Sequence, residues 1–212
     1  MIKLPASIFK YISSRYIFII AFTFVTTVCF GQHQLLDSLT LDTLTGYKTM
    51  AEALKNPDAV IKLVLRKQHL KSFPSEIFTF RNLQYLDISK NSIDEIPDSI
   101  FVLSQLQYFS CSKNGLKHIS KNIGKLSNLL YLNCNQNDLD ALPPQIGNLE
   151  NLQILDLWSN NFQEYPTTLG GLKSLKVLDL RVIEINDKEQ AKIRAMLPNA
   201  KVYMSESCGC KN

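Results

Sequence analysis

The chain of 212 residues has little of what several protein classes require. Its five cysteines are too few for a small domain stabilised mainly by disulfides. Excess charge is also scarce: without Lys3, Lys10 and Arg15, the total of 23 Lys and Arg falls to 20 against 19 Asp and Glu. Such a balance excludes a strongly basic protein that neutralises a phosphate backbone, so we expect no nucleic-acid partner. A hydrophobic content of 45% predicts a folded chain with a real core.

Catalytic and metal-binding motifs are also missing from the sequence. The histidines, His33, His69 and His118, are not spaced with a carboxylate or a second histidine as a zinc-binding helix requires. The sequence contains neither a glycine-rich phosphate loop nor the nucleophile elbow of hydrolases. We therefore expect no enzymatic activity, no cofactor and no metal site.

The first residues of the chain have the composition of an export signal. Three basic residues precede an apolar run over 16–30 that only threonines interrupt. The run has about fifteen residues, which fits a signal peptide and falls short of the roughly twenty that a spanning helix needs. The sequence predicts a signal peptide over 1–31, cleavage after Gly31, and an exported chain that is periplasmic, cell-surface or extracellular. An uncleaved membrane anchor and a lipid-modified Cys29 are the alternatives.

One spacing organises most of the remaining chain. Apolar residues recur every 23 positions, and the columns that this spacing defines extend over 59–183. A constant step over such a distance indicates an array of structural repeats. The first column is Leu63, Leu86, Phe109, Leu132, Leu155 and Leu178. The second column is Leu65, Ile88, Cys111, Cys134, Leu157 and Leu180.

Two segments show the repeat clearly. Residues 83–97 read LQYLDISKNSIDEIP, and residues 152–166 read LQILDLWSNNFQEYP. With these motifs the chain resembles the leucine-rich repeat proteins of bacteria, and the LPxxIxxL pattern of its outer segments resembles their Ras-group type. The resemblance implies an α/β solenoid with about six parallel strands on its concave face and an extended or short-helical convex side. Ras-group relatives also suggest small-GTPase signalling, which we do not expect of an exported chain.

The residue types in each repeat agree with this architecture. Two apolar residues separated by one, such as Leu155 and Leu157, lie on the same face of a short strand. Six parallel strands at a spacing of about 4.8 Å give a sheet roughly 25 Å wide with its apolar side chains in columns. An asparagine after each strand can bond the unpaired backbone of neighbouring bends, so we expect a structural ladder rather than a ligand site. That ladder is Gln68, Asn91, Asn114, Asn137 and Asn160.

The two flanks of the array predict caps, because each repeat buries its core only against a neighbour. Over 32–58 we expect a linker and a helical cap, and the part of this segment before residue 47 stays open between the two. Over 184–212 we expect a helix opened by a capping box of Asn186 and Glu189, an edge strand and a polar tail. The apolar stripe expected of the first cap is Tyr47, Met50, Ala51 and Leu54.

Functional residues are expected on the concave face. Side chains between the core positions of each strand point away from the core and form three columns, which we expect to be exposed. Aromatic and aliphatic side chains flanked by polar ones are typical of protein-contact surfaces. Tyrosine also suits a strand by propensity alone, so a purely structural column is the alternative. The predicted partner-binding residues are Tyr85, Asp87, Tyr108, Tyr131, Asn133, Ile154, Asp156, Trp158, Asp179 and Arg181.

Two pairs on this face carry further expectations. Asp156 and Asp179 are expected to be neighbours that Arg181 neutralises, with a weak calcium site as the alternative. Trp158 and Arg181 are also expected to be neighbours, which predicts a contact between the cation and the aromatic ring.

The cysteines of the array and of the tail fall into different classes. Cys111 and Cys134 replace leucine at stacked core positions, so we expect buried free thiols, with a disulfide between adjacent strands as the alternative. Cys208 and Cys210 lie in the polar tail, where they could pair with each other or with another chain.

Three functions remain open from the sequence. The first is an exported protein-binding module that acts through its concave face without catalysis. The second is binding of a glycan or of the cell wall, for which aromatic side chains also serve. The third is a membrane-anchored scaffold that keeps its N-terminal helix.

Overall fold

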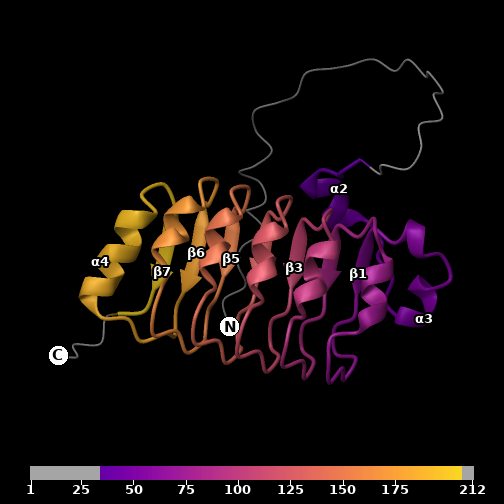
Figure 1. Ribbon diagram of the computed structural model, residues 1–212, viewed down its shortest axis with the longest axis horizontal. Helices are drawn as coiled ribbons and strands as arrows, with labels where there is room; N and C mark the ends of the chain where they lie inside the picture. The colour runs from indigo at the N-terminus through magenta and orange to yellow at the C-terminus, as the bar shows by residue number, and fades with distance from the viewer. Residues whose placement is uncertain (1–33, 207–212) are drawn as a thin grey trace, which may run out of the picture. The chain divides into compact units, whose positions relative to one another are not determined.

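The computed structural model describes residues 34–206 of the chain (Figure 1). The predicted signal peptide at 1–31 and the tail cysteines Cys208 and Cys210 lie outside the described residues. Within 34–206 the chain forms one sheet of seven parallel strands in sequence order, which confirms the predicted α/β solenoid. The strands are β1 (Lys62–Val64), β2 (Tyr85–Asp87), β3 (Tyr108–Ser110), β4 (Tyr131–Asn133), β5 (Ile154–Asp156), β6 (Val177–Leu180) and β7 (Lys201–Met204).

The strands pair in the register that the repeat spacing predicts. Leu86 lies opposite Phe109, and Leu132 lies opposite Leu155. Every member of this first core column is at most 1% exposed. Burying one large apolar side chain contributes about 1.5–3 kcal/mol, so each repeat is stabilised mainly by the column that it extends.

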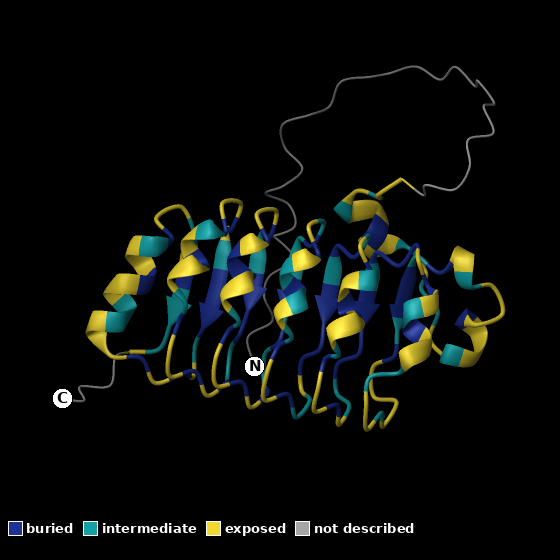
Figure 2. Cartoon of the chain, viewed as in Figure 1, coloured by how far each residue is buried: buried dark blue, intermediate teal, exposed yellow. Residues whose placement is uncertain are grey.

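Short 3₁₀ helices cover the core on the convex side (Figure 1). Four of the five in the array follow a proline whose φ lies between −64° and −70°, the range that the pyrrolidine ring imposes. Before the remaining one Ser120 replaces proline, and its hydroxyl accepts from the Asn122 N–H at 3.1 Å. The helices are η2 (Ser75–Thr79), η3 (Asp98–Val102), η4 (Lys121–Lys125), η5 (Pro144–Asn148) and η6 (Thr167–Gly171). Figure 2 shows buried strands behind these partly exposed helices.

An asparagine ladder closes the bend after each strand. Asn91 Oδ1 accepts hydrogen bonds from the N–H groups of Gln68 (2.8 Å) and Leu70 (3.1 Å) in the preceding repeat. Asn91 Nδ2 donates to the carbonyls of Leu65 (3.0 Å) and Ile88 (2.8 Å). The three later asparagines repeat this arrangement. The side chain of Gln68 is exposed, and its backbone N–H makes the contact with the ladder.

The N-terminal cap differs from the expected apolar stripe. Tyr47 precedes the cap helix and forms a parallel bridge with Leu63 of the first strand. Ala53 is fully buried, whereas Ala51 and Leu54 are exposed. The reason is that the helix has four residues, too few for a stripe of two turns. The elements of this end are α2 (Ser38–Thr43), α3 (Met50–Ala53) and η1 (Pro57–Ala59).

The C-terminal end carries α4 (Asp187–Met196) and β7. Asn186 Oδ1 accepts from the Glu189 N–H at 2.9 Å and so caps the helix. Ile193 is fully buried and packs α4 onto the core. β7 then pairs with β6, so the edge of the last repeat is covered by a further strand.

Candidate protein-binding face

Tyrosine rings form a continuous stack across strands β2 to β4 of the concave face. The ring centroids of Tyr85 and Tyr108 are 3.9 Å apart, and those of Tyr108 and Tyr131 are 4.4 Å apart, with nearly parallel planes. Lys62 Nζ lies 4.3 Å from the Tyr85 ring centroid and closes one end of the stack. Burial raises the pKa of all three hydroxyls, so they stay neutral at physiological pH. Ile154 continues this column in β5 as a half-buried side chain.

The middle column is largely buried, which corrects the expectation that it is exposed. Asp87, Asp156 and Asp179 are only 7%, 6% and 4% exposed. These side chains are short, and the larger side chains of the two flanking columns shield them from water. Asn133 in the same column is half-buried. The three carboxylates therefore support the face rather than form its outer surface.

Hydrogen bonds to the backbone explain why polar side chains occupy this column. Asp87, Asn133, Asp156 and Asp179 each accept a hydrogen bond from the N–H two residues later, at 2.8–3.2 Å. Such an Asx turn satisfies a backbone donor at the end of a three- or four-residue strand. The sequence analysis missed this structural role, although the recurrence of Asp and Asn at one position is its signal.

The two acidic neighbours are stabilised in different ways. Asp179 forms a bidentate ion pair with Arg181, whose Nη2 lies 2.6 Å from Oδ2 and whose Nε lies 3.0 Å from Oδ1. Asp156 receives a 2.6 Å hydrogen bond from Asn135 Nδ2 instead. Burial raises the pKa of Asp156 to about 6, and the negative charge of Asp179 adds to the effect. Asp156 therefore changes its charge at mildly acidic pH.

Trp158 and Arg181 do not form the expected pair. The Arg181 guanidinium lies 5.6 Å from the ring centroid of Tyr203 in β7, and the bidentate bond to Asp179 holds it there. The sequence analysis missed this contact because the edge strand lies outside the repeat spacing. Trp158 is half-buried.

A lysine occupies the bend that follows each of the first three strands. The residue at this position has a left-handed backbone in all six repeats, with φ between 53° and 59°. The first three repeats place Lys67, Lys90 and Lys113 there, and Arg66 precedes the first of them. We call these four residues the cationic row. A charge balance taken over the whole chain hides such a group, whereas the repeat spacing applied to lysine would have found it.

The segment before the first repeat covers one edge of the concave face (Figure 1). Gln84 Oε1 accepts from the Leu36 N–H at 2.8 Å, and Gln107 Nε2 donates to the Leu36 carbonyl at 2.9 Å. Lys62 Nζ donates to the Leu41 carbonyl at 3.0 Å, near the C-terminal end of α2. The segment that the sequence left open is therefore part of the cap and lies against Lys62 of β1 and against the glutamines that directly precede β2 and β3.

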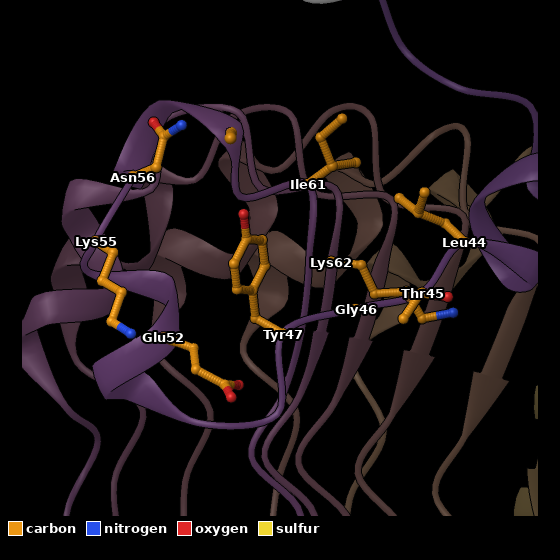
Figure 3. A pocket seen from close by; sticks show the side chains of 10 residues that line it. Leu44, Thr45, Gly46, Tyr47, Glu52, Lys55, Asn56, Ile61 and Lys62 are labelled. Atoms are coloured by element: carbon orange, nitrogen blue, oxygen red, sulfur yellow. The ribbon is translucent and has the colours of Figure 1, made fainter.

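A pocket of about 620 Å³ lies at the N-terminal end of the described chain (Figure 3). The Tyr47 side chain stands in its middle, with Glu52 and Lys55 of the cap on one side and Lys62 on the other. The pocket is lined by residues of the cap and of the first strand and contains none of the predicted partner-binding residues.

Cys111 and Cys134 are buried free thiols in adjacent repeats. Their Sγ atoms lie 3.2 Å apart. The hydrogen bond with Cys111 and burial both raise the pKa of the Cys134 thiol. Both side chains pack as small members of the second core column.

Metal and membrane features can be stated for residues 34–206. This part of the chain brings together no group of three or more side chains that could hold a metal ion. None of its helices combines the length and the apolar character that crossing a bilayer requires.

Two family profiles match the repeat array. The profile described as leucine rich repeat matches residues 59–116, and the profile described as leucine-rich repeat region matches residues 109–196. Curated protein sequences give no match.

Solved structures of leucine-rich repeat proteins are similar to much of the chain. A leucine-rich repeat protein of Leptospira interrogans is 31% identical, with a TM-score of 0.63, over 78% of this chain and 49% of that one. The plant peptide hormone receptor RGFR1, solved in complex with RGF2, is 30% identical, with a TM-score of 0.58, over 69% of this chain and 24% of that one. Internalin C2 of Listeria monocytogenes is 23% identical, with a TM-score of 0.64, over 76% and 67% of the two chains.

The chain thus spans about half of the Leptospira protein and about a quarter of the plant receptor. The matched profiles and the similar structures cover the part of the chain in which the strands and the asparagine ladder repeat. The chain belongs to the leucine-rich repeat family.

Proposed function

We propose that the chain is an exported module that binds a protein partner on its concave face and carries out no catalysis. The observation that carries this proposal is the partly exposed surface of Tyr131, Ile154 and Trp158 on a rigid sheet. Aromatic side chains on a rigid scaffold lose little conformational entropy on binding and are enriched among the residues that dominate affinity. The peptide bound to the similar plant receptor supports a polypeptide as the partner.

The sequence of the first residues supports export. Basic residues followed by an apolar run of about fifteen residues have the order and length of a signal peptide. Mass spectrometry of the chain purified from its source organism should find a mature chain that begins at Gln32. A chain that keeps Met1 and stays in the membrane fraction would support the anchored scaffold instead.

The stacking of the tyrosines favours a protein over a glycan as partner. A sugar packs against an open ring face, but Tyr108 has Tyr85 on one side and Tyr131 on the other, at 3.9 and 4.4 Å. The Lys62 ammonium occupies the outer face of the Tyr85 ring. The stack therefore presents mainly ring edges and hydroxyl groups, which suit contacts with peptide groups.

Site-specific photo-cross-linking in cells of the source organism tests the proposed face. A photoreactive phenylalanine analogue at Trp158 should give a defined adduct with one partner protein. The matched control is Phe101, an exposed side chain of η3 that is 42% exposed on the convex side. The same adduct from both positions, or an adduct from Phe101 alone, would contradict binding through the concave face. An adduct with a polysaccharide would point to the glycan function.

A further inference from the structure

The cationic row has a fixed register on the scaffold. The N–H groups of Lys67, Lys90 and Lys113 donate to carbonyls of the next repeat at 3.2, 2.8 and 2.9 Å. These bonds continue the parallel pairing of the strands, so the three lysines follow one another at about the strand spacing of 4.8 Å. The row therefore presents aligned positive charges along one edge of the concave face over roughly 10 Å.

The charges of the row are not neutralised within residues 34–206. The ion pairs in this part of the chain involve His118, Lys173, Arg181 and Lys192, and none involves the cationic row. Repulsion from Arg66, with smaller contributions from desolvation, Lys113 and Lys67, lowers the pKa of Lys90. Asp87 belongs to the same repeat as Lys90, but its carboxylate is buried and accepts the Ser89 N–H. An anionic ligand would therefore meet uncompensated positive charge along the row.

The bend itself does not require lysine. A left-handed backbone favours glycine or asparagine, and a lysine at φ 55–59° has no conformational advantage there. The three later repeats make the same bend with Gln136, Ser159 and Val182, which carry no charge. Lysine at three consecutive repeats therefore concentrates charge on the first half of the face without a structural reason.

The dimensions of the row fit an extended polypeptide. A strand rises about 3.3 Å per residue, so roughly three residues of an extended chain span the three lysines. The four cations of the row are fewer than the roughly six to ten phosphate contacts that a strongly salt-dependent duplex-binding protein makes. The buried Ser89 hydroxyl, at the strand position equivalent to Arg66, has no hydrogen-bond partner among the described residues.

We propose that the cationic row binds an acidic, extended segment of the protein partner, whose carboxylates lie along Lys67, Lys90 and Lys113. This inference rests on the proposed protein-binding function, because it names the chemistry of the partner. The tyrosine stack and Trp158 then contact the rest of that partner, and the row fixes which part of it lies against the first three repeats.

Fluorescence anisotropy with the full chain tests this proposal. The probe is a labelled synthetic peptide of about twelve alternating glutamate and serine residues, measured at low salt where exposed ion pairs are least screened. Wild type should bind it, and the triple variant Lys67→Gln, Lys90→Gln, Lys113→Gln should bind about tenfold more weakly. Gln136 already occupies the equivalent bend at φ 53°, so the substitution leaves the fold intact.

The matched control removes the same charge elsewhere. Lys55→Gln, Lys121→Gln and Lys188→Gln change three exposed lysines away from the row, and the peptide should keep wild-type affinity within about twofold. Equal loss in both triple variants would overturn the proposal, because net charge alone would then explain binding. Failure of wild type to bind the peptide would overturn it too. A single-stranded oligonucleotide that binds more tightly than the peptide through the row would also overturn it and make nucleic acid the ligand.

The two experiments distinguish a failure of the proposed function from a failure of this inference. If the peptide does not bind while Trp158 still cross-links to one protein, the acidic segment is wrong and the concave face stands. If the peptide binds through the row while Trp158 gives no protein adduct, the wider face is wrong and the row stands.

Discussion

The first three strands and the next three carry the same scaffold but opposite chemistry on the concave face. The first half carries Lys62, two of the three stacked tyrosines (Tyr85 and Tyr108) and the cationic row, with one buried carboxylate, Asp87. In the second half Asp156 and Asp179 lie next to each other, and no lysine occupies the bend. The core columns run through both halves, and the ladder has two asparagines in each: Asn91 and Asn114, then Asn137 and Asn160. The repeat therefore constrains the core residues and the ladder, whereas the residues on the concave face can differ from repeat to repeat.

The largest expected effect is the loss of a ladder asparagine, and it should be equal in the two halves. Asn114 accepts from the Ile93 N–H at 3.0 Å and donates to the Cys111 carbonyl at 2.9 Å. Asn160 makes the equivalent bonds in the second half, at 3.1 and 2.8 Å. Asn114→Ala and Asn160→Ala should each lower the free energy of unfolding by about 2–4 kcal/mol, because buried backbone groups lose their partners.

Urea unfolding followed by circular dichroism measures both variants. The exposed Asn161→Ala, next to the ladder, is the control and should stay near wild type. A large loss for one ladder variant and none for the other would show that the two halves do not share one scaffold.

The next largest effect concerns only the second half and depends on pH. The folded-state pKa of Asp156 is about 6, above the value near 3.9 of an unfolded chain. Between these values the folded chain binds more protons, so the free energy of unfolding falls as pH rises from about 4 to about 6. Asp156→Asn should therefore raise stability above wild type by about 1–2 kcal/mol at pH 8, and by much less at pH 4.

Thermal unfolding of wild type and of Asp156→Asn at several pH values tests this difference in stability. Asn133 occupies the same column in the preceding repeat, so an amide fits the site. The exposed Asp138→Asn controls for the loss of one negative charge. A variant whose stability follows the wild-type pH profile unchanged would show that Asp156 does not titrate in this range.

A smaller effect belongs to the first half alone. Lys62 is 8% exposed and joins the carbonyls of Leu41 and Asp42, at 3.0 and 2.7 Å, to the tyrosine stack. Lys62→Met should detach α2 locally and lower the free energy of unfolding by about 1 kcal/mol. Hydrogen exchange should then become faster over 36–44 and stay unchanged in the second half, whereas the exposed control Lys48→Met should change neither. Protection of α2 in the Lys62 variant would show that the glutamines alone hold the segment.

The fold could be predicted from the sequence because each structural position recurs several times. Six repeats place an apolar residue at the position of Leu132, so the register can still be recognised where one repeat departs from the pattern. The asparagine after each strand could be assigned for the same reason. The N-terminal cap could not, since Tyr47 and Ala53 occur once and their packing depends on contacts outside the repeat.

The sequence predicted which residues form the columns of the candidate face, but not how deeply each side chain is buried. Alternation along a strand places Asp87 and Asp156 on the concave face, yet their exposure depends on the size of side chains in other strands. The bonds of Gln84 and Gln107 to the N-terminal segment also escaped prediction, because they join residues 48 and 71 positions apart. Long-range contacts of single side chains leave no periodic signal.

The smallest expected effect lies in the row that distinguishes the first half. Positive neighbours lower the pKa of Lys90, so its ammonium is repelled in the folded chain. Lys90→Gln should therefore leave stability unchanged at high salt and raise it slightly at low salt, because screening already removes the repulsion at about 1 M. Ser159→Gln, at the same bend of the second half, should show no dependence on salt. If Lys90→Gln instead destabilises the chain most at low salt, an acidic group neutralises the row within the folded protein, and the two halves differ less than their sequences suggest.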